Sequence, residues 1–248
     1  SYSAEDIGTQ CYKYGTKSVT ISYRTQPLGY EWPDGISEKP LVTHFEEDTA
    51  FFSDGTSQKF DAVIMCTGYL FHFPFLPDEL RLQTHNCLYP ANLYKGIFWQ
   101  PNPQLIYLGM QDQYFTFNMF DAQAWYARDV ILGKIELPSL EERQKDEQQW
   151  LERHENLTDA DSEIDFQASY IRDLYDATDY PEFEVEKQGE IFKQWKRDKK
   201  KGIMTFREKS YRSTLTGTLA PELPKPWLNI MDDSLEHFLN ITLEKKSR

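Results

Sequence analysis

The feature that most constrains the fold is a short apolar run, DAVIMC, at residues 61–66, which continues into Thr67, Gly68 and Tyr69. A strand that is apolar at consecutive positions has no solvent face, so it belongs in a parallel sheet covered on both sides. The end of such a strand faces the crevice where α/β sheets bind ligands. The run therefore predicts an α/β fold with a ligand site at Thr67 and Gly68. A plain tight turn at the same place is the alternative.

The segment before this run predicts a helix followed by a strand. Residues 3–15 begin with Ser3, a good capping residue, and end with Gly15, which can terminate a helix. Residues 18–24 are rich in β-branched side chains, as strands are. Helix, turn and strand in this order form the second half of a βαβ unit.

Further strands and helices are expected downstream. Asp54 and Gly55 form a hairpin signal between two of the strands. From residue 139 charged residues dominate and the pattern becomes helical. The expected strands lie at 42–45, 49–53, 59–66 and 105–108, and the expected helices at 116–133, 139–155, 159–178 and 184–200.

Composition narrows the class of protein. A formal net charge of -13 argues against nucleic acid and anionic membranes as partners, because both would repel the average surface. The three cysteines form no CxxC pair, and the histidines form no HExxH motif, so no metal site is predicted. No apolar run approaches the roughly 20 residues that span a bilayer. A cytoplasmic protein is expected.

Long motifs resemble the flavin-containing monooxygenases. DAVIMCTGY resembles the strand plus ATGY or CTGY motif that marks this family, and residues 1–15 look like the helix of its second GxGxxG fingerprint. Residues 109–133 and 195–221 are similar to the bacterial trimethylamine-oxidising branch. The chain is identified as a member of that family by a resemblance that spans nearly its whole length.

The resemblance implies an α/β flavoprotein with two Rossmann-like dinucleotide-binding domains, for FAD and NADPH, and a helical C-terminal region. Residues 1–66 would be the C-terminal part of the NADPH domain, 67–138 the returning part of the FAD domain and 139–248 the helical region. Both glycine-rich loops and the catalytic Asn are expected upstream of this chain. The chain alone is therefore expected to be inactive and poorly soluble, and the full-length parent to be a homodimer.

The implied activity is N- or S-oxygenation of a small amine or sulfide, such as trimethylamine to its N-oxide. In the family NADPH reduces FAD, O2 adds to form a C4a-hydroperoxide, and the substrate attacks the terminal oxygen. Two alternatives remain open, a related Baeyer-Villiger-type flavoenzyme and a truncated, non-catalytic product. The absence of CxxC counts against a third, a disulfide reductase.

Nucleotide-binding roles also follow from the resemblance. Tyr2 and Ser3 would touch NADPH, and Arg24 would face its 2′-phosphate, which a guanidinium recognises well. Trp195 and Arg207 match family positions near the nicotinamide nucleotide, and a neighbouring subunit could be the one that supplies them. The alternatives are a solvated Arg24, a solvated basic face at residues 196–202 and a packing role for Trp195.

Flavin contacts are expected from the loop before the helix at 116–133. By resemblance, Gln113 and Thr116 would lie against the flavin ring, where their amide and hydroxyl suit its nitrogen and carbonyl edge. Gln111, Asp112 and Asn118 would support them. For any single aromatic residue around this loop, a place in the core is the favoured explanation.

Overall fold

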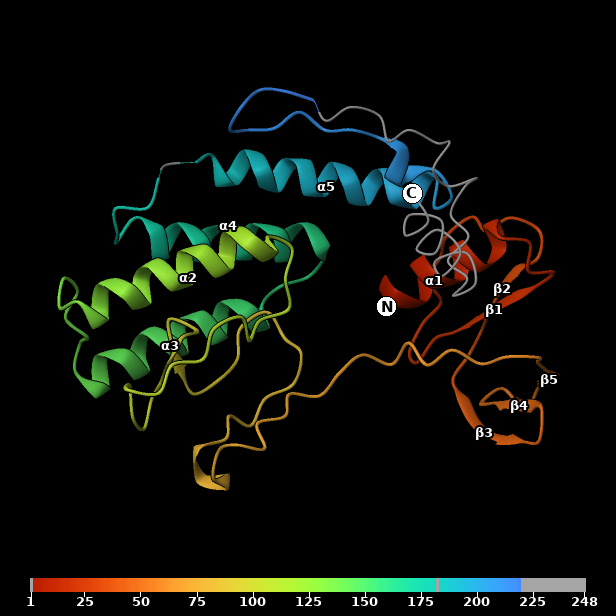
Figure 1. The fold of residues 1–248 in the computed structure, drawn as a ribbon, viewed down its shortest axis with the longest axis horizontal. Helices are drawn as coiled ribbons and strands as arrows, with labels where there is room; N and C mark the ends of the chain where they lie inside the picture. The colour runs from red at the N-terminus through yellow and green to blue at the C-terminus, as the bar shows by residue number, and fades with distance from the viewer. Residues whose placement is uncertain (1, 182, 220–248) are drawn as a thin grey trace, which may run out of the picture. The chain divides into compact units, whose positions relative to one another are not determined.

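The computed structural model describes residues 2–181 and 183–219. The chain divides into two compact units, Ser1–Phe206 and Arg207–Arg248. The helices and strands follow one another as shown in Figure 1. They are α1 (Tyr2–Lys13), β1 (Val19–Ser22), β2 (Ile36–Lys39), β3 (Val42–Glu46), β4 (Thr49–Phe52), β5 (Ser57–Lys59), η1 (Asp78–Leu80), β6 (Leu93–Tyr94), β7 (Phe98–Trp99), α2 (Thr116–Ile131), α3 (Leu140–Glu155), α4 (Ala160–Tyr175), α5 (Val185–Lys201) and η2 (Phe206–Glu208).

The predicted first helix is confirmed as α1, and its end has a clear cause. Gly15 adopts a φ of 93°, which suits glycine at the end of a helix. The Thr16 N–H donates to the Cys11 carbonyl at 3.1 Å and the Gly15 N–H to Tyr12 at 3.0 Å, the paired bonds of a Schellman cap. The chain thus leaves α1 in a fixed direction towards β1.

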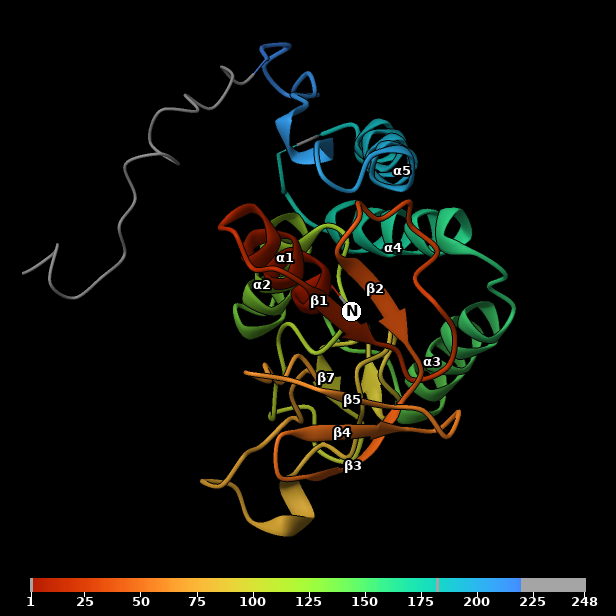
Figure 2. The same ribbon diagram turned by 90° about the vertical axis from the view of Figure 1, so that its right-hand side faces the viewer.

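The predicted strand at 18–24 is confirmed as β1, which pairs in parallel with β2. Helix α1 packs on β1 through Gly8, where an added Cβ would lie 3.3 Å from the Ile21 side chain. Figure 2 shows α1 beside this two-stranded sheet. Ile21 and Ile36 are buried in it. The helix-strand half of a βαβ unit is therefore present, together with a parallel partner strand that the sequence pattern had not predicted.

Strands β3, β4 and β5 form an antiparallel meander. The predicted Asp54-Gly55 turn joins β4 to β5, with Gly55 at a φ of 81°. The Asp54 carboxylate accepts hydrogen bonds from the Thr56 hydroxyl at 2.7 Å and the Thr56 N–H at 2.9 Å. These bonds hold the pKa of Asp54 below its usual value.

The two strands expected to be most buried are not formed. Residues 61–66 belong to no strand, and Val63, Ile64 and Met65 are 52%, 57% and 71% exposed. Instead β5 ends at Lys59. Residues 105–108 make only a bridge between Ile106 and Phe98. A strand buried on both faces needs hydrogen-bonded neighbours and covering layers, and the described residues provide neither for 61–66.

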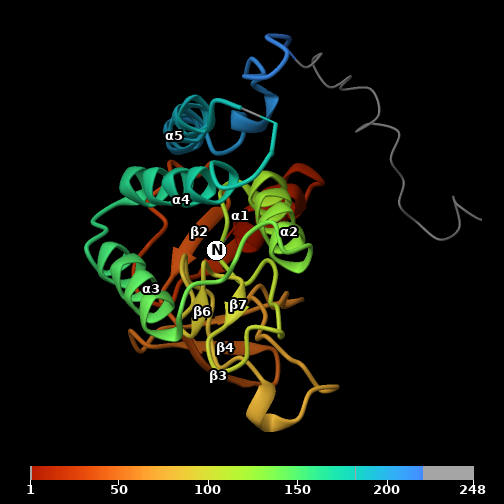
Figure 3. The same cartoon turned by 90° about the vertical axis from the view of Figure 1, so that its left-hand side faces the viewer.

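The four predicted helices after residue 115 are confirmed as α2 to α5. Helix α4 is central, because it packs against α2, α3 and α5 (Figures 1 and 3). Two of the helices begin at side-chain caps. The Ser139 hydroxyl accepts the Glu142 N–H at 3.3 Å while the Glu142 carboxylate accepts the Ser139 N–H at 2.9 Å. Such a cap contributes about 1 kcal/mol to helix stability.

Aromatic side chains fill the core among these helices. The Tyr89 ring, 1% exposed, lies 5.7 Å from Trp150, 6.5 Å from Phe166 and 5.9 Å from Tyr170, measured between ring centroids. Burial of each such ring stabilises the fold by roughly 1.5–3 kcal/mol, before the entropy of ordering it is counted. The segment before α2 is thereby tied to α3 and α4.

In the second unit, the described residues 207–219 contain a tight turn. Arg212 and Leu219 form a β-bridge, and the Ser213 N–H donates to the Thr218 carbonyl at 2.8 Å. The helical region expected over 139–248 is helical through Lys201, apart from its connecting segments. Residues 220–248 of that expectation lie outside the described residues.

Candidate functional site

Two of the predicted nucleotide-binding residues meet in the structure although 193 positions separate them. Tyr2 begins α1 and Trp195 lies on α5; their ring centroids are 6.3 Å apart with planes inclined at 38°. The Tyr2 residue is 47% exposed, so part of it is open to a ligand. Phe206 packs edge-on against Trp195 at 5.3 Å. We call Tyr2, Tyr30, Trp195 and Phe206 the aromatic box.

A lysine lies inside the aromatic box. Lys199, one turn beyond Trp195 on α5, places its ammonium 4.3 Å from the Tyr2 ring centroid and 5.3 Å from that of Trp195. The corresponding distances to Tyr30 and Phe206 are 5.5 Å and 5.7 Å. All four lie within the range of cation–π attraction.

The charge of Lys199 is paired inside the protein. Its ammonium contacts the Glu5 carboxylate, and both side chains are 4% exposed. The Tyr30 hydroxyl donates to the other Glu5 oxygen at 3.3 Å. Burial and the nearby Glu5 carboxylate raise the pKa of Tyr30. Helices α1 and α5 are thus joined by a buried ion pair.

A second lysine on α5 contacts the loop before α2. The Lys196 ammonium donates to the Tyr114 hydroxyl at 3.0 Å, and that hydroxyl donates to the Glu163 carboxylate at 2.5 Å. Burial lowers the pKa of Lys196, and the positive charge of Lys199 adds to the effect. Burial and the bond to Glu163 raise the pKa of Tyr114.

A buried network of side-chain amides holds the loop that carries Gln113 against helix α2. Gln123 of α2 accepts the Gly109 N–H at 2.8 Å and donates to the Gln111 side chain at 2.9 Å. Both amides also donate to the Tyr170 hydroxyl, which in turn donates to the Lys95 carbonyl at 2.7 Å. All three side chains are at most 1% exposed, so these bonds are shielded from water.

A side chain of helix α4, Gln167, holds the backbone of the same loop. Gln167 accepts the Tyr114 N–H at 2.6 Å and donates to the Asp112 carbonyl. The amide nitrogen of Gln113 donates to the Gln111 carbonyl at 2.8 Å, whereas its side-chain oxygen accepts no bond among the described residues. Thr116 is half-buried and opens α2. Gln113 and Thr116 therefore lie on one rigid loop-helix junction.

A charged group of this loop, Asp112, lies close enough to the aromatic box to act on Tyr2. Burial raises the pKa of the Tyr2 hydroxyl, and the negative charges of Asp112, Glu5 and Glu163 raise it further. Asp112 directly precedes Gln113, and its N–H donates to the Cys87 carbonyl at 2.7 Å. The structure thus brings four predicted residues, Tyr2, Trp195, Gln113 and Thr116, into one region of the first unit.

The other predicted residues are not gathered there by any described contact. Ser3 follows Tyr2 and is exposed, and Arg24 is exposed two residues beyond β1. Thr67 and Gly68 are exposed on the irregular segment after β5, where Gly68 has a φ of 79°. Arg207 belongs to the second unit. The strand expected at residues 59–66 is therefore wrong beyond Lys59, whereas the site expected at Thr67 and Gly68 stays a prediction.

Sequence reasoning missed the residues inside the box. The sequence pattern offers Lys199 only as part of a solvated basic face at residues 196–202, and it gives Glu5 no role at a site. Lys199 is instead 3% exposed. One signal was available: positions 195 and 199 share a helix face, so a tryptophan and a lysine four residues apart can point to the same partner.

Residues 2–181 and 183–219 contain no group of His, Cys, Asp or Glu side chains that could hold a metal ion. None of their helices is long and apolar enough to cross a membrane.

Known proteins resemble this chain closely. It is 60% identical over 240 residues to the trimethylamine monooxygenase of Methylocella silvestris, covering 97% of this chain and 53% of that protein. The trimethylamine monooxygenase of Pelagibacter ubique is 52% identical over 240 residues, covering 97% and 54%. The chain thus spans about half the length of the curated relatives it matches.

Solved structures agree with these matches. The crystal structure of Tmm from Pelagibacter sp. strain HTCC7211 superposes with a TM-score of 0.89 at 51% identity, covering 96% of this chain and 54% of that one. The S-allyl-L-cysteine S-oxygenase of Allium sativum, at a TM-score of 0.66 and 23% identity, covers 84% and 49% and shares the fold.

A family model decides the classification. The model described as flavin-binding monooxygenase-like matches residues 34–199, which include β2, the meander, the Gln113 loop and most of α5. The resemblance seen in the sequence motifs is confirmed. The chain belongs to the flavin-binding monooxygenase-like family.

Proposed function

We propose that this chain forms the NADPH side, and part of the flavin-facing wall, of an FAD- and NADPH-dependent monooxygenase that N-oxygenates small amines such as trimethylamine. The observation that carries the proposal is the meeting of Tyr2 and Trp195 around Lys199, beside the Gln113 loop. The 60% identity to a trimethylamine monooxygenase supports the amine as substrate. Small sulfides are the second substrate class, because they share the soft nucleophilic character of the amine.

The site residues fit the two cofactors chemically. A partly exposed tyrosine ring beside a tryptophan suits the planar nicotinamide nucleotide. The Gln113 oxygen is an acceptor without a protein partner among the described residues, as a flavin N–H requires. Gly68 has no atom within 4 Å of where a Cβ would stand, so its backbone is open to approach.

Each residue then has a definite task. Tyr2, Ser3 and Trp195 bind and orient the nicotinamide nucleotide, Arg24 binds the 2′-phosphate, and Arg207 adds a further cation. Thr67 and Gly68 present backbone to the cofactor. Gln113 and Thr116 orient the flavin edge, and the aromatic side chains around them exclude water. When bound, FAD and NADPH supply the electrons and the oxygen transfer, with NADPH, H+, O2 and the amine giving NADP+, water and the N-oxide.

The proposal includes the larger organisation of the parent protein. Residues 1–66 complete an NADPH-binding domain, residues 67–138 complete an FAD-binding domain, and residues 139–248 form the C-terminal region that begins with α3, α4 and α5. The other half of the length found in the relatives supplies the remaining cofactor contacts and the catalytic Asn. A cytoplasmic homodimer is the proposed state.

An assay on the product of the complete reading frame tests the proposal. The purified protein, loaded with FAD, is given NADPH and O2 with trimethylamine, a thioether or a cyclic ketone, and each oxygenated product is measured. We expect trimethylamine N-oxide as the main product and a smaller yield of sulfoxide. A lactone as the main product would show a Baeyer-Villiger enzyme. A protein that neither retains flavin nor oxidises NADPH would contradict the proposal and support a non-catalytic chain.

A further inference from the structure

The Glu5–Lys199 ion pair is an unusual way to join two helices. Both side chains are 4% exposed, so each charge has lost nearly all of its hydration. Such desolvation offsets much of the attraction, and well-packed apolar residues of similar size often stabilise a contact equally well. Stability alone therefore gives little reason for a buried charge pair at this contact.

The geometry around the pair suggests another role. The Lys199 ammonium lies over Tyr2 at 4.3 Å and near Trp195 at 5.3 Å, and these two rings line the candidate nucleotide site. A cation attracts the face of an aromatic ring and so favours particular ring orientations. Glu5 in turn fixes the ammonium between α1 and α5.

The pair is neutral as a unit, which limits what it can do. The carboxylate of Glu5 offsets the Lys199 charge, and the Tyr30 hydroxyl donates to the same carboxylate. Lys199 is also enclosed by the box, so it is poorly placed to bind a phosphate directly. Its influence on a ligand must pass through the rings that it contacts.

We propose that Glu5 and Lys199 are positioning residues that hold the Tyr2 and Trp195 rings in the orientation that binds the nicotinamide nucleotide. The inference rests on the proposed function. It assigns the tightness of nucleotide binding to an ion pair that does not touch the ligand. Loss of the pair should therefore raise the KM for NADPH and change kcat at saturating NADPH much less.

The test compares three variants of the product of the complete reading frame, Lys199→Met, Glu5→Gln and the double variant. Each single change leaves one buried polar partner unmatched and lowers the thermal midpoint. The double change removes both charges and recovers most of the midpoint. Loss of the cation–π contacts should raise the KM for NADPH about tenfold in Lys199→Met and in the double variant, with kcat within about threefold.

Lys193→Met is the matched control. Lys193 lies on the same helix, is similarly buried, and pairs with Asp165 at 2.6 Å and Glu190 at 2.8 Å, but has no described contact with the aromatic box. It should lower the thermal midpoint and leave the KM for NADPH unchanged.

The outcomes separate the alternatives. If the double variant recovers the KM together with the midpoint, or if Lys193→Met raises the KM as much, the pair is only structural and the inference fails. If the unsubstituted protein oxidises no NADPH, the proposed function is wrong, and the positioning role that rests on it is wrong as well. A raised KM confined to the variants at positions 5 and 199 supports the inference.

Discussion

At the scale of single residues, the loop that carries Gln113 is held by buried side chains that use all of their hydrogen-bonding groups. Tyr170 shows this most clearly, because its hydroxyl accepts from Gln111 and Gln123 and donates to the Lys95 carbonyl. The neighbouring Gly96 has a φ of 62°, and a Cβ there would lie 2.2 Å from the Gln111 amide nitrogen. The network therefore admits very little change in shape.

Removal of this hydroxyl should weaken the whole loop. Tyr170→Phe leaves buried amide donors and an acceptor without partners, so we expect a loss of about 1–3 kcal/mol in the free energy of unfolding. Chemical denaturation measures it. Tyr14→Phe is the control, since Tyr14 is exposed and should shift stability by less than about 0.5 kcal/mol. Equal stability of the two variants would contradict the role given to the network.

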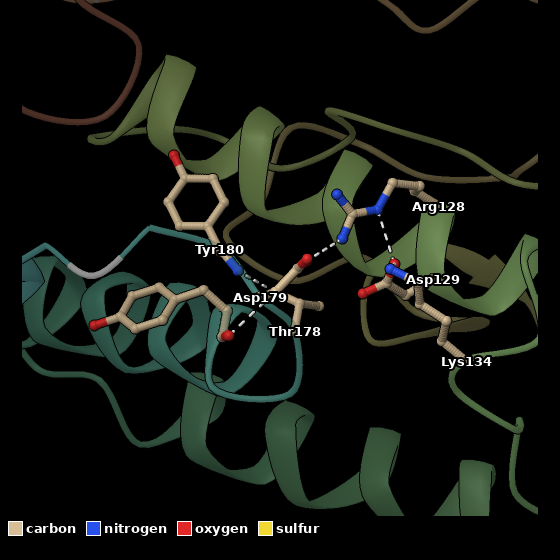
Figure 4. Close-up of polar contacts among 7 residues, drawn as sticks. Arg128, Asp129, Lys134, Thr178, Asp179 and Tyr180 are labelled. Atoms are coloured by element: carbon tan, nitrogen blue, oxygen red, sulfur yellow. Dashed lines mark hydrogen bonds and ion pairs between the residues drawn. The ribbon is translucent and has the colours of Figure 1, made fainter.

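At the scale of elements, ion pairs at the end of helix α2 connect it to the segments around it. Helix α2 ends in a charged cluster, shown in Figure 4. Arg128 bonds to Asp129 at 2.8 Å and also to Asp179, and Lys134 lies 3.2 Å from Asp129. The bond from Arg128, aided by Lys134, holds the pKa of Asp129 below its usual value.

This depressed pKa predicts a dependence on pH. An aspartate whose pKa is lower in the folded state stabilises the fold above its unfolded pKa, near 4, and loses that contribution as the pH falls through the folded value. Asp129→Asn should therefore lower the thermal midpoint at pH 7, and the difference from the parent should shrink at pH 3. Asp61→Asn, at an exposed position, is the control. A difference that stays constant from pH 7 to pH 3 would rule out this explanation.

Elements with local signals could be predicted from the sequence. Helices α1 to α5 could be predicted from helical spacing and charged composition, and the β4–β5 turn from Asp54-Gly55, because these signals act within a few residues. The cap expected at Ser3 is not formed, since Ser3 lies inside α1. The Tyr2–Trp195 contact could not be derived from spacing, since its partners lie on helices 193 positions apart. Its two rings were predicted from the family resemblance, and the signal for Lys199 was its place four residues after Trp195 on the same helix.

At the scale of the whole molecule, the failed prediction concerns residues that depend on distant neighbours. The run at 61–66 has the composition of a doubly covered strand, yet it is exposed, and Tyr69 beyond it is 99% exposed. A strand is defined by its partners, so composition alone could not decide its state. Under the proposed function, the remaining half of the length found in the relatives provides those partners.

The central claim is that this chain provides the NADPH side of a flavin monooxygenase. Anaerobic reduction of the FAD-loaded product of the complete reading frame tests it most directly. The reduction is measured as the loss of the visible absorbance of the oxidised flavin. We predict rapid reduction by NADPH, much slower reduction by NADH, and loss of that preference in Arg24→Ala. Reduction at equal rates by both nucleotides, or a protein that holds no flavin, would contradict the account.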